Sequence, residues 1–183
     1  MTKCLKLLES MKKQVRKNIF ETNSSSTHSI VIGNNGEDIY AGLPRKLEFH
    51  GDEFGWEHRL YTDTQTKADY LFTSLIYTDT PLEYIERIKS ILAKWNIEAE
   101  FDEIEEKRYE SGYVCYEVKD KFCYVDHGDG NQDLVKELCE DEAKLMNYLF
   151  SDGSYVETSN DNEDYRKLGN NPKFLMLDYY KGN

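Results

Sequence analysis

The order of predicted elements along these 183 residues indicates an α+β fold, with a small, mostly antiparallel sheet and two to four packed helices. Two segments place apolar residues at helical spacing, and several shorter runs have the composition of strands. The helical and strand segments do not alternate regularly, as they would in a parallel sheet covered by helices. We therefore expect an α+β domain rather than a doubly wound α/β domain.

The first 15 residues are predicted to form a basic helix or an extension of the domain. Residues 1–20 carry six bases and one acid, and apolar positions recur every three or four residues from Cys4 to Val15. Met11 begins the run Met-Lys-Lys-Gln-Val-Arg-Lys, which resembles a translation start, so residues 1–10 are either an addition or part of this helix. Residues 16–183 are expected to form a single α+β domain.

Short strands are predicted on both sides of the helical segments. The hydroxyl-rich stretch 19–29 predicts a loop or turn. The predicted strands are Ser29–Ile32, Lys46–His50, Glu98–Ile104, Tyr155–Thr158 and Phe174–Tyr179. A hairpin is also predicted, from Tyr113–Val118 and Lys121–Val125 around Lys119-Asp120. This hairpin would place Cys115 and Cys123 on opposite faces, so we expect reduced thiols rather than a disulfide.

Three helical regions are predicted in the remainder of the chain. Asp63–Tyr77 has a regular apolar stripe, with Asp63 or Thr64 available as the N-cap. The next helix begins with Thr80-Pro81-Leu82-Glu83, which predicts a capping box with proline at the first helical position, and is expected to stop at Asn96. Asp133–Phe150 predicts a third helical region, broken near Asp141.

Charge is distributed unevenly, and this restricts the classes of partner. The formal net charge is −12, but residues after position 20 carry 17 bases and 34 acids, a net charge of −17. Such an acidic body repels nucleic-acid phosphates, so direct binding of duplex DNA is disfavoured. No apolar run approaches the length of a membrane span, and no signal-peptide pattern begins the chain, so we expect a cytoplasmic protein that does not bind membranes.

Few residues suggest catalysis. Ser24, Ser25, Ser26 and Ser29 lie near His28, but no Gly-x-Ser-x-Gly motif is present, and turn formation is the commoner use of such a run. Asp126 and His127 are the remaining acid–base candidates. No spacing of histidines or cysteines predicts a zinc site, and the segment after Asp126 matches only a fragment of a calcium loop. We expect no metal, no cofactor and no enzymatic activity.

Acidic and aromatic residues suggest a partner-binding surface. In a strand, Glu98, Glu100 and Asp102 would line one face at intervals of about 6.6–6.8 Å, which is close to the spacing of phosphates along a nucleic-acid strand. A second segment mixes acids with large aromatics, as protein interfaces do. Its candidate residues are Asp52, Glu53, Phe54, Trp56 and Glu57. The alternative for each segment is a solvated acidic face with Phe54 and Trp56 in the core.

Three segments carry a resemblance to a known family. They are Phe20-Glu21-Thr22-Asn23-Ser24-Ser25-Ser26-Thr27-His28-Ser29, Gly51-Asp52-Glu53-Phe54-Gly55-Trp56-Glu57 and Thr66-Lys67-Ala68-Asp69-Tyr70-Leu71. Together they resemble a family of small phage and mobile-element proteins, whose members typically open with Met-Lys-Lys and the first of these motifs. The family includes an anti-CRISPR protein that inhibits a type II nuclease. Residues 1–10 depart from the family pattern.

Three classes of function follow from these observations. The resemblance implies an inhibitor that binds a guide-loaded type II CRISPR effector nuclease and blocks target DNA binding or cleavage. The acidic body suits this role, because such nucleases hold nucleic acid in basic channels. The alternatives are a phage enzyme or binding protein for a small phosphorylated or nucleotide-like ligand, held by Thr22–Ser29 with Asp126 and His127, and a phage structural protein that self-associates, so a homo-oligomer remains open.

Overall fold

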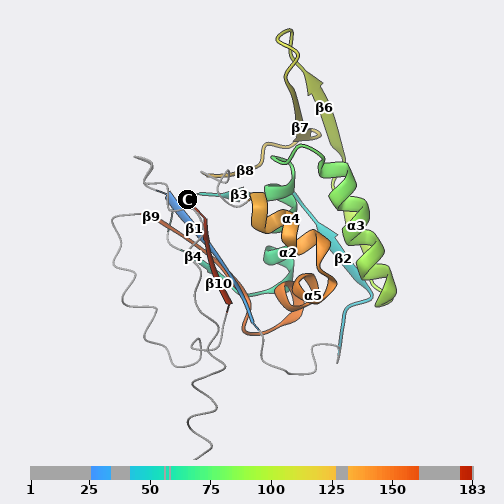
Figure 1. The fold of residues 1–183 in the computed structure, drawn as a ribbon, viewed down its shortest axis with the longest axis vertical. Helices are drawn as coiled ribbons and strands as arrows, with labels where there is room; N and C mark the ends of the chain where they lie inside the picture. The colour runs from blue at the N-terminus through green and yellow to red at the C-terminus, as the bar shows by residue number, and fades with distance from the viewer. Residues whose placement is uncertain are drawn as a thin grey trace, which may run out of the picture.

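The computed structural model describes residues 26–33, 42–55, 57, 59–126, 132–160 and 178–182. Four helices and several small, mostly antiparallel sheets make up this part of the chain, which confirms the predicted α+β class. Figure 1 shows the largest sheet at one side of the molecule and the longest helix at the other, with the remaining helices between them. The basic segment 1–15 lies outside the described residues.

The largest sheet has four strands in the order β10-β1-β9-β4, all antiparallel to their neighbours. Its strands are β1 (Ser26–Ile32), β4 (Arg59–Tyr61), β9 (Tyr155–Asn160) and β10 (Asp178–Gly182). The predicted loop over 19–29 is therefore wrong for its last four residues, since β1 begins at Ser26. Neighbouring strands on both sides of β1 supply hydrogen-bond partners for its backbone, and such pairing overrides the turn preference of serine and threonine.

The helices confirm most of the predicted boundaries. They are α2 (Thr64–Leu75), α3 (Pro81–Lys94), α4 (Gln132–Glu140) and α5 (Glu142–Phe150). Asp63 caps α2, accepting a hydrogen bond from the Thr66 backbone N–H at 2.8 Å, and Asp141 separates α4 from α5 by capping α5. The predicted capping box is wrong, because the Thr80 side chain makes no capping hydrogen bond and Glu83 pairs with Arg87 instead.

Three two-stranded sheets complete the fold. The strands β2 (Lys46–Phe49) and β5 (Glu98–Phe101) are parallel, as are β3 (Glu53–Phe54) and β8 (Tyr124–Val125). The strands β6 (Ile104–Arg108) and β7 (Val114–Val118) form an antiparallel arm that projects from the body (Figure 1). The predicted continuous strand over 98–104 is thus interrupted between β5 and β6.

The predicted hairpin between 113–118 and 121–125 is wrong. The strand β7 pairs with β6, which precedes it, through a turn in which Gly112 adopts a φ of 84°. The segment after β7 turns at Asp120 and then continues to β8, where the Tyr124 N–H donates to the Asp52 carbonyl at 3.1 Å. Cys115, Cys123 and Cys139 are free thiols. Local alternation allowed either pairing, and contacts distant in sequence decided between them.

The core lies between the four-stranded sheet and α3. It includes Tyr70 and Phe72 of α2, Leu138 of α4 and Tyr148 of α5, none of which is accessible to solvent. Phe54 of β3 belongs to this core, where its ring packs edge-to-face against Tyr70 at a centroid distance of 4.9 Å. Because α2 contacts strands and helices on several sides, it positions the segment from β2 to β3 that carries the candidate site.

Candidate functional site

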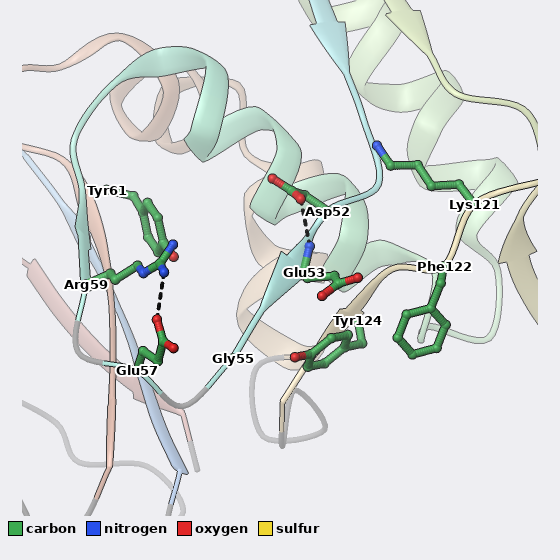
Figure 2. Close-up of a pocket in the computed structure, with 9 residues that line it drawn as sticks. All are labelled: Asp52, Glu53, Gly55, Glu57, Arg59, Tyr61, Lys121, Phe122 and Tyr124. Atoms are coloured by element: carbon green, nitrogen blue, oxygen red, sulfur yellow. Dashed lines mark hydrogen bonds and ion pairs between the residues drawn. The ribbon is translucent and has the colours of Figure 1, made fainter.

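A surface pocket of about 400 Å³ opens where β3, β4 and β8 meet (Figure 2). Its lining combines three acids, two bases and three aromatic rings: Asp52, Glu53, Glu57, Arg59, Lys121, Tyr61, Phe122 and Tyr124, together with Gly55. We call it the aromatic–acidic pocket. The parallel pairing of β3 with β8 places the acids of one segment beside the aromatic residues of the other.

The charges of the pocket are only partly balanced. Arg59 pairs with Glu57 at 2.6 Å. The ammonium group of Lys121 lies 3.9 Å from an Asp102 oxygen. Asp52 accepts a hydrogen bond from the Glu53 backbone N–H at 2.9 Å, but neither Asp52 nor Glu53 pairs with a base within the described residues. Two carboxylates therefore remain available to a cationic partner.

Phe122 is the most exposed large apolar side chain among the described residues, with 76% of its surface accessible. Its ring lies beside that of Tyr124, at a centroid distance of 5.6 Å. Figure 2 shows both rings next to the Glu53 carboxylate at the pocket opening. An exposed aromatic ring beside free carboxylates is typical of a binding surface, since burial of the ring would stabilise a complex.

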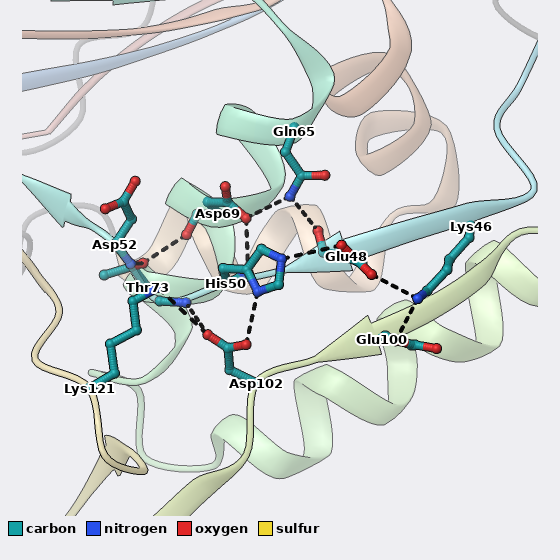
Figure 3. A network of polar contacts seen from close by, with 11 residues as sticks. Lys46, Glu48, His50, Asp52, Gln65, Asp69, Thr73, Glu100, Asp102 and Lys121 are labelled. Carbon is teal, nitrogen blue, oxygen red and sulfur yellow. Dashed lines mark hydrogen bonds and ion pairs between the residues drawn. The ribbon is translucent and has the colours of Figure 1, made fainter.

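A polar network centred on His50 holds the segment that leads into the pocket at Asp52 (Figure 3). His50 Nδ1 lies 2.8 Å from Asp102 Oδ1, and the other Asp102 oxygen accepts from the Gly51 N–H at 3.0 Å. On the opposite side, the His50 N–H donates to Asp69 of α2 at 2.9 Å. Two residues after His50, Asp52 donates its N–H to the Thr73 hydroxyl of α2 at 3.0 Å. These bonds hold the backbone that leads into β3.

The protonation of this network follows from its geometry. The hydrogen bond to Asp102 raises the pKa of His50 above its usual 6.5. Burial raises the pKa of Asp69, whereas a hydrogen bond from Lys46 lowers the pKa of Glu48. Glu48 Oε2 lies 3.4 Å from His50 Nε2, so protonated His50 is placed between two carboxylates. The network is thus more tightly held when His50 is charged.

The structure brings together some of the predicted partner-binding residues and separates others. Asp52, Glu53 and Glu57 line the pocket, whereas Phe54 is 1% exposed and therefore belongs to the core alternative. Trp56 lies outside the described residues.

The predicted acidic row is interrupted. Glu98 and Glu100 are exposed on β5, and Glu100 pairs with Lys46 at 2.8 Å. Asp102 follows the end of β5 and is turned toward His50 and Gly51, so it does not continue the row. Because its carboxylate accepts hydrogen bonds from its neighbours, Asp102 has a structural role. The alternation of side chains along a strand does not predict such a role.

The serine-rich motif is described only in part. Positions 20–25 lie outside the described residues, and Ser26 and Thr27 are placed by their backbone in β1. His28 is 1% exposed, with Nδ1 3.2 Å from the Tyr70 hydroxyl, and Ser29 is also buried. Of the acid–base candidates, Asp126 is half-buried and its N–H donates to the Phe54 carbonyl, while His127 lies outside the described residues.

Sequence reasoning missed five residues of the pocket: Arg59, Tyr61, Lys121, Phe122 and Tyr124. The available signal was weak. Phe122 and Tyr124 alternate with Cys123, which is compatible with an ordinary half-buried strand. Their proximity to Glu53 depends on the pairing of β3 with β8, which joins segments far apart in the chain.

Comparisons of the chain with protein-family models, curated proteins and solved structures found no match. Within the described residues, no group of three or more His, Cys, Asp or Glu side chains is arranged to hold a metal ion. Of the helices that the structure describes, none is both long and apolar enough to cross a membrane.

Proposed function

We propose that this protein is a phage or mobile-element inhibitor that binds a guide-loaded type II CRISPR effector nuclease in the bacterial cytoplasm and blocks target DNA binding or cleavage. The protein acts by binding and needs no catalytic residues of its own. The observation that carries the proposal is the aromatic–acidic pocket, where Asp52 and Glu53 stand beside the exposed ring of Phe122.

The charge of the protein supports a basic partner. A chain with a net charge of −12 is attracted to the basic channels in which such nucleases hold nucleic acid. Long-range attraction of this kind accelerates association, while the contacts formed after docking set the lifetime of the complex. The carboxylates near the pocket would accelerate association, and the aromatic rings would lengthen the lifetime of the complex.

The pocket supports this proposal better than the predicted acidic row does. Glu100 already pairs with Lys46, and Asp102 is engaged with His50. A partner would have to break these contacts to use the two side chains. A partner can contact Asp52 and Glu53 without breaking an ion pair, because no base of the described residues neutralises them. We therefore place the binding surface at the pocket. Glu98 and Glu100 are expected to contribute less to the affinity.

The experiment measures binding of the full chain to a guide-loaded type II nuclease, and inhibition of DNA cleavage by that nuclease. The double variant Asp52→Asn/Glu53→Gln is expected to weaken binding about threefold to tenfold and to reduce the salt dependence, since exposed charges contribute modestly. The matched control is Glu98→Gln/Glu100→Gln, which removes the same charge from β5 and is expected to have the smaller effect.

Two results would contradict the proposal. If the wild-type protein bound no guide-loaded type II nuclease, the inhibitor function would be wrong. If binding occurred and the two double variants weakened it equally, the affinity would depend on overall charge, and the pocket would not be the binding surface.

A further inference from the structure

Figure 2 shows two of the acids, Asp52 and Glu53, on the same side of the aromatic–acidic pocket as the rings of Phe122 and Tyr124, with Glu57, Arg59 and Tyr61 opposite. Phe122 and Tyr124 stand with their ring planes inclined by 41°. The Glu53 carboxylate lies next to them, and the Tyr124 N–H is bonded to the Asp52 carbonyl, which holds the two segments in register. The pocket volume of about 400 Å³ leaves room for one long side chain to enter between these groups.

The charges of the lining favour a cation over an anion as the guest. Arg59 is held by Glu57 at 2.6 Å, so its guanidinium is already neutralised. The Lys121 ammonium group is directed toward Asp102, on the side of the His50 network. An anion entering the pocket would instead meet Asp52 and Glu53, which have no basic partner in the described part of the chain.

The rings favour a planar cation over a compact one. A guanidinium group can lie flat against an aromatic face while its N–H groups donate to a carboxylate in a two-pronged contact. An ammonium group is a strongly hydrated point charge and gains less from the ring. With 76% of its surface accessible, Phe122 has its ring available for such stacking.

We infer that the aromatic–acidic pocket binds the guanidinium group of an arginine side chain presented by the partner protein, with the exposed ring of Phe122 stacking on it, Tyr124 beside it and Glu53 accepting its hydrogen bonds. This inference deepens the proposed function, on which it depends only for the identity of the partner. The arginine is recognised by its shape and charge, so the site can be tested without the nuclease.

The test titrates the isotopically labelled full chain with two peptides, acetyl-Gly-Arg-Gly-amide and acetyl-Gly-Lys-Gly-amide, and follows the backbone amide signals by NMR. Both peptides carry the same charge, so the general attraction of an acidic protein for cations is common to both. The arginine peptide is expected to bind about twofold to fivefold more tightly, and to shift the signals of Glu53, Phe122 and Tyr124.

Two variants separate the contributions of the ring and the carboxylate. Phe122→Ala is expected to remove the preference for arginine and leave a weaker affinity common to both peptides. Glu53→Gln is expected to lower the affinity for both peptides. Matched controls on the arm are Tyr113→Ala, which removes another exposed ring, and Glu110→Gln, which removes another exposed acid; both are expected to leave the two affinities unchanged.

Equal affinity for the two peptides, shifts located away from the pocket, or no binding at all would overturn the inference. Failure of the proposed function gives a different pattern, in which the arginine preference is present but no type II nuclease binds. If the nuclease bound the wild type and Phe122→Ala equally well while the peptide preference was absent, the inhibitor function would stand and the arginine site would be wrong.

Discussion

His50 Nδ1 lies 2.8 Å from Asp102 Oδ1, and this contact joins the end of β2 to the end of β5. The second oxygen of the same carboxylate accepts the Gly51 N–H, so one side chain holds two consecutive residues of the segment that leads to Asp52 and Glu53. The acids of the pocket are therefore presented by backbone that is fixed through Asp102 on one side and through α2 on the other.

The first prediction concerns pH. Because the Asp102 carboxylate raises the pKa of His50 in the folded protein, the stabilisation is fully present below the ordinary pKa of 6.5 and is lost as pH rises through the folded value. The effect is at most about 1 kcal/mol, since the side chain is 43% exposed and solvent screens the pair. In urea unfolding of both proteins at about pH 6 and about pH 8.5, the stability of the wild type relative to His50→Gln should fall by this amount at the higher pH, because the contribution of Lys67 is common to both proteins.

Comparison with the variant isolates the histidine from other groups that face the network. The carboxylates of Glu48, Asp69 and Asp102 and the ammonium groups of Lys46 and Lys121 face the network in both proteins, so their contributions are common to the wild type and the variant. A wild type and a His50→Gln variant whose stabilities changed in parallel between the two pH values would contradict the prediction.

The second prediction concerns Lys67, which lies within α2 and is 1% exposed. Its ammonium group donates to the backbone carbonyls of Ser151 and Ser154, and burial lowers its pKa from 10.5 to about 8. Between these values the unfolded chain binds more protons than the folded protein, so rising pH stabilises the fold. Relative to Lys67→Met, the wild type should gain on the order of 2 kcal/mol between about pH 7.5 and about pH 9.5.

Urea unfolding of the two proteins at both pH values measures this difference. The methionine variant is the reference for the wild type. Both proteins contain the same cysteines and tyrosines, so the contributions of these groups cancel in the difference. A constant difference in stability across the range would mean that Lys67 titrates as it does in the unfolded chain.

The third prediction concerns the close approach of Gly51 to the end of β7 and to the segment that follows it. A Cβ atom at Gly51 would lie 2.8 Å from Val118 Cγ2 and 3.0 Å from Cys123 Sγ. Gly51→Ala should therefore cost about 1–3 kcal/mol in the free energy of unfolding. Gly55→Ala is the matched control, because the nearest atom to its Cβ is the Tyr124 hydroxyl oxygen at 3.6 Å, and it should change stability by less than about 0.5 kcal/mol.

Chemical denaturation of both variants checks the prediction. Equal stability of Gly51→Ala and the wild type would show that Val118 and Cys123 move aside at little cost, and the tight contact would then be of no consequence for the fold.

The fourth prediction distinguishes the two phenylalanines near the site. Phe54→Ala should destabilise the protein by about 3–5 kcal/mol, because the ring is fully buried against Tyr61 and Tyr70. Phe122→Ala should leave the free energy of unfolding within about 0.5 kcal/mol of the wild type, since its ring is mostly exposed. A stable Phe54→Ala protein would return Phe54 to the candidates for direct partner contact.

The helices could be predicted from the sequence because their determinants are local. The apolar spacing within α2, the proline at the start of α3 and the capping aspartates Asp63 and Asp141 act within one or two turns of the chain. Asn96, the predicted stop of α3, adopts a φ of 57°, a conformation that asparagine tolerates better than most residues. Such signals need no knowledge of the rest of the fold.

The candidate site could be predicted only in part. Composition identifies the segment containing Asp52, Glu53 and Glu57, but it is compatible with Phe54 in either the core or an interface. Large apolar side chains occur both in protein cores and in protein interfaces, so composition does not distinguish a buried phenylalanine from one that contacts a partner. Burial in the folded protein does, and it assigns Phe54 to the core and leaves Phe122 exposed.

By itself, the sequence determined the fold class, the four helical segments and the acidic charge, which follow from periodicity, capping and composition. Tertiary structure alone decided which strands pair, that Asp102 serves His50 rather than an acidic row, and that Tyr124 lies beside Glu53. The physical reason is that strand pairing and ion pairing join residues distant in the chain. An alternating segment is compatible with several partners until packing of the whole domain selects one.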